Sequence, residues 1–175
     1  MRYTTVDTPL GELMLWGHDG RLAGADFVEP HVTSRLPEAR RALKRGHLDP
    51  DPAWDRDDDA FAEVAEQLRA YFAGQLTDFD VAVDTRGTPF QQRVWSALER
   101  IPFGTTTTYG KLAEELGDRR AVRAVGLANG ANPISIIIPC HRVVGANGSL
   151  IGYGGGLARK EWLLAHERGE VRLPW

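Results

Sequence analysis

Cysteine is nearly absent from this chain of 175 residues, which contains only Cys140. A single thiol excludes an internal disulfide and any metal site built from several cysteines, and the chain offers it no resolving partner. No apolar run approaches the length of a membrane-spanning helix, and the first residues lack the charged, apolar and small-residue order of a signal peptide. We therefore expect a cytoplasmic protein that does not associate with membranes.

Charge is unevenly distributed along the chain. Residues 1–87 carry 10 Lys and Arg against 17 Asp and Glu, whereas residues 88–168 carry 10 against 6. The second part therefore suits a polyanion, although the formal net charge of the whole chain is -3. Small domains that bind no polyanion also differ by this much, so the asymmetry supports nucleic-acid binding without deciding it.

The first 28 residues predict a small antiparallel meander. Apolar and polar positions alternate there around turn signals at residues 8–11 and 18–20. Residues 29–59 are rich in charge and proline, a composition typical of an exposed, poorly packed and mobile connection.

A helix and a further strand are expected to complete this part of the chain. Large apolar residues recur at helical spacing over residues 61–72, with Asp59 as a cap at the start and Gly74 as a stop. This helix would cover the meander. Residues 76–84 alternate again and predict a strand.

A domain boundary is expected near residues 84–88, where the pattern becomes mostly helical. Thr88 and Gln91 have the spacing of a capping box, and Pro89 lies at the first helical position. Apolar residues then follow one face as far as residue 101, which predicts a helix. We place the two domains at residues 1–86 and 87–175.

Residues 108–116 and 119–129 predict two short helices joined by a glycine turn, which indicates a helix-turn-helix. The second helix carries Arg119, Arg120 and Arg123 among Ala, Val and Gly residues. Small residues would allow the backbone close to a nucleic-acid groove, while the guanidinium groups reach phosphates or stacked bases. Tight helix packing with solvated arginines is the alternative interpretation.

Cys140 follows a β-branched run at residues 133–138 that predicts a buried strand. A lone cysteine is usually a small buried apolar residue. Here His141 and Arg142 bring two polar groups beside the sulfur, the kind of surroundings that raise a thiol's thiolate fraction. A base needs an orienting carboxylate, and Glu167, at the end of a predicted helix, is a candidate.

Four stretches of the second half resemble the O6-alkylguanine-DNA alkyltransferases, also called methylated-DNA--protein-cysteine methyltransferases. The stretches are GTPFQQRVWSALERIPFGTTTTYGKLAEELG, RAVGLANGANPI, IIIPCHRVVG and GYGGGLARKEWLLAHE. The resemblance implies an α/β (α+β) fold. In that fold a small N-terminal antiparallel sheet with a helix, similar to ribonuclease H, precedes a helical C-terminal winged helix-turn-helix domain.

The resemblance assigns the chemistry to five residues. Cys140 would accept the alkyl group, His141 would deprotonate it through a water molecule, and Glu167 would orient the histidine. Asn132 would brace the turn around the site, although an ordinary turn residue before a proline would look the same. Tyr109 would help to rotate the target nucleotide and would donate a hydrogen bond to the departing guanine; otherwise it is a packing aromatic.

Substrate and DNA contacts follow from the same resemblance. The main-chain oxygens of Cys140 and Val143 would accept from the guanine amine, with Tyr153 and the N–H of Gly154 near O6. Some relatives carry Ser at the position of Gly154, which leaves the role of a hydroxyl there open. On the DNA side, Arg123 would fill the space left by the flipped base, and the remaining DNA-binding candidates are Gly110, Arg119 and Arg120.

The implied reaction is an irreversible, stoichiometric transfer that consumes the protein and requires no cofactor or metal. Its substrate would be double-stranded DNA containing O6-alkylguanine, bound from the minor groove, and the protein would be a monomer in the absence of DNA. Activity on O4-alkylthymine stays open. Two alternatives come from other classes: a non-catalytic sensor of alkylated guanine and a winged-helix regulator. Cys140 argues against the sensor, and the chain has no evident dimer element for the regulator.

Overall fold

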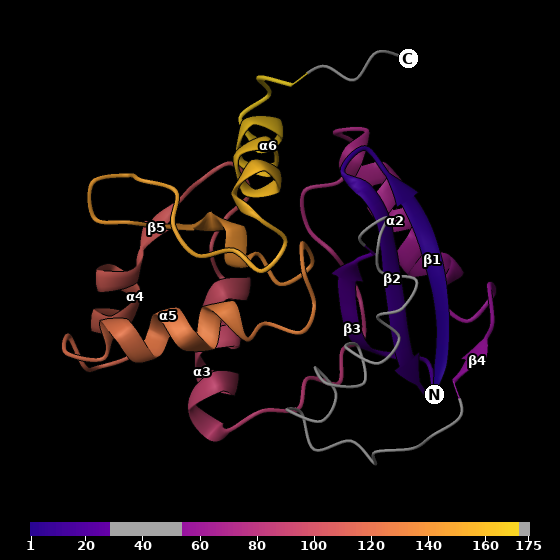
Figure 1. The fold of residues 1–175 in the computed structure, drawn as a ribbon, viewed down its shortest axis with the longest axis horizontal. Coiled ribbons are helices and arrows are strands. Elements are labelled where there is room, and N and C mark those ends of the chain that lie inside the picture. Colours follow the sequence, from indigo (N-terminus) through magenta and orange to yellow (C-terminus); the bar gives the residue numbers. More distant parts are fainter. Residues whose placement is uncertain (29–53, 172–175) are drawn as a thin grey trace. The chain divides into compact units, whose positions relative to one another are not determined.

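The computed structural model describes residues 1–28 and 54–171, which belong to two compact units, Met1–Gly87 and Thr88–Trp175. Among the described residues, the first unit contains a sheet and helix α2, and the second contains short helices joined by loops (Figure 1). The expectation of a mobile connection falls mostly on residues 29–53, which lie outside the described residues. No helix in the described ranges is long and apolar enough to cross a membrane.

The expected meander is confirmed in the first unit. Strands β1 (Arg2–Thr8), β2 (Gly11–His18) and β3 (Arg21–Phe27) pair antiparallel in the order β3-β2-β1. Alternation buries one face, where Leu13 lies opposite Val6 and Leu15 lies opposite Thr4.

The end of the predicted mobile connection is instead part of the sheet. Strand β4 (Asp55–Arg56) pairs parallel with the start of β1. Trp54 packs beside Trp16, with ring centroids 6.1 Å apart. The charged residues Asp55 and Arg56 are exposed as expected, but backbone pairing and the neighbouring aromatic contact hold them in the sheet.

Helix α2 (Ala62–Phe72) contacts β1 and buries its apolar stripe, including Leu68 and Tyr71. The expected cap at Asp59 is wrong, because the helix begins after a turn closed by the side chain of Asp57, and no side chain caps its start. The predicted stop is confirmed: Gly74 adopts a φ of +71°, and its N–H donates to the main-chain oxygen of Tyr71.

The predicted strand over residues 76–84 is wrong. Only Val83 forms a bridge, to Leu22 of β3, and the flanking backbone bonds join Leu22 to residues 82 and 84. Earlier in this segment, the Gln67 side chain both donates to the main-chain oxygen of Asp80 and accepts from its N–H. A side chain therefore satisfies backbone groups that a strand would have used.

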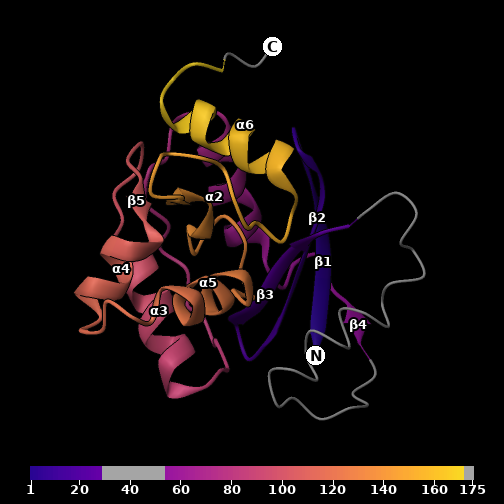
Figure 2. The ribbon, with the colours of Figure 1, turned by 60° about the vertical axis from the view of Figure 1, so that its left-hand side comes forward.

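The second unit begins with helix α3 (Pro89–Glu99), and the predicted capping box is confirmed. The Thr88 hydroxyl accepts from the N–H of Gln91, and the Gln91 side chain accepts from the N–H of Thr88. Helices α4 (Tyr109–Glu115) and α5 (Val122–Gly130) follow as the expected short pair, and α5 packs against both α3 and α4 (Figure 2).

Strand β5 (Thr107–Thr108) pairs parallel with β6 (Val143–Val144). This short ladder fixes the start of α4 beside the segment that follows Cys140. The last described helix, α6 (Leu157–Glu167), contacts the 3-10 turn at Cys140–Arg142.

The predicted strand at residues 133–138 is wrong, although most of the segment is buried as expected. Its backbone forms a turn in which the N–H of Ile138 donates to the main-chain oxygen of Ile134. The Asn132 side chain accepts from the N–H of Ile134 and donates to the main-chain oxygen of Ile138. Buried apolar side chains and an asparagine bridge thus override the β propensity of the run.

Candidate active site around Cys140

Cys140 begins a 3-10 turn and is 5% exposed. Its N–H donates to the main-chain oxygen of Ile138, and the N–H of Arg142 donates to that of Pro139. The backbone is therefore tightly turned at the thiol rather than extended. This turn places His141 and Arg142 inside the unit, where both are buried.

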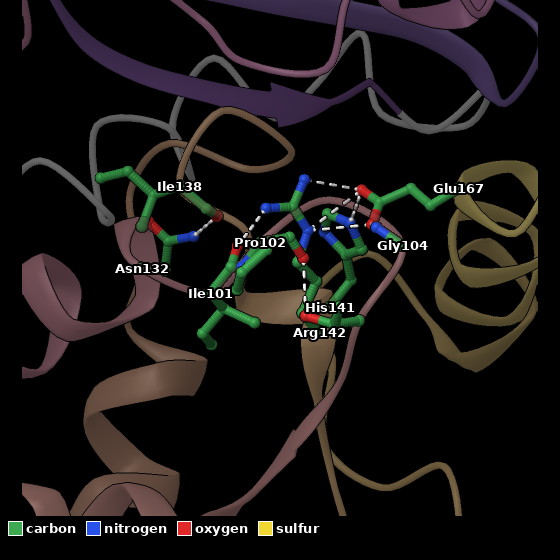
Figure 3. A network of polar contacts seen from close by, with 9 residues as sticks. Ile101, Pro102, Gly104, Asn132, Ile138, His141, Arg142 and Glu167 are labelled. Atoms are coloured by element: carbon green, nitrogen blue, oxygen red, sulfur yellow. Dashed lines mark hydrogen bonds and ion pairs between the residues drawn. The ribbon is translucent and has the colours of Figure 1, made fainter.

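Glu167 binds His141 in the interior of the second unit (Figure 3). The distance between Nε2 of His141 and Oε1 of Glu167 is 2.8 Å, and both side chains are fully buried. An ionised carboxylate only accepts, so Nε2 carries the hydrogen and Nδ1 is left as the basic nitrogen. Among the described residues, Nδ1 has no hydrogen-bond partner.

Arg142 forms a second ion pair with Glu167. Its Nε and Nη2 lie 2.9 Å from Oε2 and Oε1, and its Nη1 donates to the main-chain oxygen of Ile101 at 2.6 Å. The N–H of Gly104 also donates to Glu167. The sequence suggested Arg142 as a cation beside the sulfur, but the structure directs its guanidinium to Glu167 and Ile101.

The charges of this network favour a neutral histidine beside an ionised glutamate. Burial alone raises the pKa of Glu167, but hydrogen bonds from His141 and Arg142 and the charge of Arg142 outweigh burial and lower that pKa to about 2. Burial lowers the pKa of His141, against an opposing effect of Glu167. At neutral pH His141 can therefore act as a proton acceptor.

Lys160 is a buried site residue that the sequence analysis missed. Its ammonium donates to the main-chain oxygens of Val143 at 2.6 Å and Ile151 at 2.7 Å, and the side chain is fully buried. Burial lowers its pKa to about 8, while attraction to a Cys140 thiolate acts in the opposite direction. A lysine on an amphipathic helix gives no sequence signal that it faces inward.

Tyr109 and Asn129 contact each other next to the main chain of Cys140. Nδ2 of Asn129 lies 3.4 Å from both the Tyr109 hydroxyl and the main-chain oxygen of Cys140. The Tyr109 hydroxyl donates to the main-chain oxygen of Ile151, and burial raises the tyrosine pKa. Asn129, 2% exposed, thus links the second helix of the pair to the thiol segment, a role that the sequence analysis did not assign.

The other predicted site residues are placed as follows. Asn132 closes the turn before the thiol, Val143 is fully buried, and Tyr153 is half-buried. Gly154 is exposed, and an added Cβ there would meet no atom within 4 Å. The structure therefore brings Tyr109, Asn132 and Val143 to the Cys140 segment through hydrogen bonds and strand pairing.

The predicted DNA-contacting residues lie on the surface of α4 and α5 and the turn between them. Gly110, Arg119, Arg120 and Arg123 are all exposed. Arg119 forms an ion pair with Glu114. Across the described residues, no group of three or more His, Cys, Asp or Glu side chains is arranged to hold a metal ion.

Two family models together match nearly the whole chain. The one for the ribonuclease-like domain of 6-O-methylguanine DNA methyltransferase matches residues 1–85, and the one for its DNA binding domain matches residues 89–169. The chain belongs to the 6-O-methylguanine DNA methyltransferase family. The fold expected from the resemblance, a sheet domain followed by a helical DNA-binding domain, is confirmed.

Individual relatives agree with this membership. A methylated-DNA--protein-cysteine methyltransferase from Mycobacterium bovis is 50% identical over 98% of this chain and 94% of its own length. One from Methanosarcina acetivorans is 43% identical over 95% of this chain and 98% of its own. The crystal structure of Mycobacterium tuberculosis OGT in complex with DNA has a TM-score of 0.81 and 48% identity, covering 97% of this chain and 94% of that one.

Proposed function

We propose that this protein repairs DNA by moving the alkyl group of O6-alkylguanine onto Cys140, once per molecule. The observation that carries the proposal is the buried His141–Glu167 pair directly after the chain's only cysteine. Membership of the methyltransferase family supports alkyl transfer as the reaction of this site. Because His141 is neutral, it can accept the proton of the thiol.

The transfer requires a thiolate. The proton of the Cys140 thiol passes through a water molecule to Nδ1 of His141, and Glu167 stabilises the resulting imidazolium. The sulfur attacks the alkyl carbon in line, the carbon–sulfur bond forms, and the carbon–O6 bond breaks with its electron pair going to guanine. The product is a thioether with no route back, so each molecule reacts once.

The leaving guanine would be held by groups of the same segment. The Tyr109 hydroxyl would turn its single hydrogen from the main-chain oxygen of Ile151 to the departing base, and the N–H of Gly154 and the side chain of Tyr153 would lie near O6. The main-chain oxygens of Cys140 and Val143 accept from the guanine amine. The oxygen of Val143 accepts from the Lys160 ammonium and keeps a second lone pair for the amine. The oxygen of Cys140 accepts from the N–H of Val143 and from Asn129, so the guanine amine would replace the long Asn129 bond there.

The base must leave the duplex to reach a thiol that is 5% exposed. We assign helix α5 to the minor groove, with Arg123 filling the space left by the flipped nucleotide. Gly110, Arg119 and Arg120 would contact the DNA around it. One protein monomer would act on one lesion, with little dependence on sequence and a strong dependence on salt.

Intact-protein mass spectrometry tests the proposal. The protein is mixed with duplex DNA containing one O6-methylguanine, and peptide mapping locates the added mass, with Cys140→Ser as the control variant. One methyl group per molecule on Cys140 is expected. Selective binding of the lesion without an adduct would instead indicate a non-catalytic sensor, and neither adduct nor selectivity would leave a DNA-binding regulator.

A further inference from the structure

The exposed face of helix α5 carries a large apolar side chain next to Arg123. Leu127 is 71% exposed, the most of the four large apolar residues exposed in the described part of the chain. Val122, at the start of the same helix, is another of the four, at 38%. A single exposed leucine is common on protein surfaces, so its neighbours on the helix have to identify any function.

Leu127 and Arg123 are neighbours on one surface. They are four residues apart in α5, so their side chains lie one turn above the other on the same face. Ala124, Gly130 and Ala131 complete the exposed side with little bulk. The buried face, with Val125, Ala128 and Asn129, packs inward instead.

The positive charge near Leu127 favours a nucleic acid as the partner of this face. The helix contains no acidic residue, Arg123 lies beside Leu127, and Arg119 and Arg120 precede the helix in the same exposed stretch. The stretch also falls within the DNA binding domain of the family. An apolar side chain one turn from an arginine, on a face of small residues, matches the minor groove, where phosphates flank apolar sugar edges and base steps.

We propose that Leu127 is an apolar wedge that enters the minor groove of duplex DNA beside Arg123. Its side chain packs on deoxyribose and base edges next to the flipped nucleotide and stabilises the opened step. This role rests on the proposed placement of α5 on DNA and adds a second inserted side chain to it. Because the contact is apolar, it favours no base and adds affinity without adding charge.

Two measurements on the full chain test the wedge. The first is the Kd for a duplex as a function of salt. Leu127→Ala should weaken binding by roughly 5- to 30-fold, the effect of losing one buried leucine contact. The slope of log K against log salt should stay the same, since no phosphate contact is lost, whereas Arg123→Ala should change it.

The second measurement is the rate of methyl transfer to two substrates. Leu127→Ala should slow transfer to duplex DNA but leave transfer to a trinucleotide containing O6-methylguanine unchanged, because a trinucleotide has no groove. Leu127→Met should restore most of the duplex rate. Leu157→Ala is the matched control, since Leu157 is 48% exposed and lies at the start of α6 instead of on α5.

Specific outcomes overturn the wedge. If Arg123→Ala weakens duplex binding and Leu127→Ala does not, the wedge is wrong while α5 still binds DNA. If neither variant changes duplex binding, the placement of α5 itself is wrong. An equal loss of duplex binding in Leu157→Ala would show that any exposed leucine has this effect, which contradicts the wedge. A change in the sedimentation coefficient of Leu127→Ala without DNA would show that Leu127 contacts a second copy of the chain instead.

Discussion

Nζ of Lys160 lies 2.6 Å from the main-chain oxygen of Val143, so a buried ammonium holds the strand that leaves the thiol turn. The same ammonium binds Ile151, whose main-chain oxygen also accepts from Tyr109. One cation therefore ties together the nucleophile segment, the loop before α6 and the tyrosine proposed to hold the leaving base.

Replacing Lys160 with Met should slow methyl transfer to the trinucleotide at least tenfold, which corresponds to about 1.4 kcal/mol of barrier. The buried carbonyls of Val143 and Ile151 lose their donor, and the thiolate loses a nearby positive charge. Iodoacetamide modification of Cys140 should slow in parallel. Lys111→Met, at an exposed lysine of α4, is the matched control. Equal rates in Lys160→Met and the unmodified protein would contradict this role.

Glu167→Gln should remove a pH-dependent part of the stability. The pKa of Glu167 is about 2 in the folded protein against 4.5 for the free side chain, so the unfolded chain takes up the proton first as the pH falls. The stabilisation is therefore complete above pH 4.5 and is lost as the pH falls towards 2. Its size is roughly 3 kcal/mol, at 1.36 kcal/mol for each pKa unit.

Denaturant unfolding at pH 6 and pH 3 measures this effect. The variant should have a lower free energy of unfolding than the wild-type protein at pH 6, and this difference should become smaller at pH 3. Glu170→Gln is the control, because that carboxylate pairs with Arg168 at the surface. If the difference in free energy of unfolding stays constant with pH, the destabilisation comes from packing instead of charge.

Two glycines separated by one residue should respond differently to alanine. Gly152 has a φ of +58°, and a Cβ there would lie 3.2 Å from the Tyr109 hydroxyl. Gly152→Ala should cost about 1–2 kcal/mol of stability from the backbone alone and should slow transfer by moving Tyr109. Gly154→Ala should be tolerated, since its Cβ meets nothing within 4 Å. Thermal unfolding and trinucleotide transfer rates compare the pair, and the reverse order would refute the placement of Tyr109.

Thr88→Ala should lower the free energy of unfolding of the second unit by about 1 kcal/mol, because the cap of α3 loses its acceptor for the N–H of Gln91. Thr88→Ser keeps the hydroxyl and should recover most of the loss. Thermal denaturation of both variants checks this, and an unchanged midpoint in Thr88→Ala would mean that the cap contributes nothing.

Local signals in the sequence predicted the parts of the fold that local forces decide. The capping box at Thr88, the stop at Gly74 and the three-stranded meander each depend on neighbouring residues, and each is confirmed. Residues 76–84 and 133–138 were predicted as strands from propensity. In the structure, the side chain of Gln67 binds the backbone of the first segment, and the side chain of Asn132 binds the backbone of the second. An alternation of apolar and polar residues does not reveal such side-chain hydrogen bonds.

The sequence also predicted that Glu167 orients His141, and these two side chains lie 2.8 Å apart. It did not find Lys160 or Asn129. Both face inward from helices whose apolar pattern alone would leave a lysine or asparagine on the surface. Their roles come from carbonyl groups supplied by distant segments, which only the folded chain brings together.

Helix α6 supplies both Lys160 and Glu167, two turns apart, to the main chain and the histidine that follow Cys140. On the proposed mechanism, a chain cut before Leu157 keeps the nucleophile and the histidine but lacks the carboxylate that binds the histidine and the ammonium that binds Val143. Such a fragment should therefore transfer no alkyl group until α6 is supplied as a second piece.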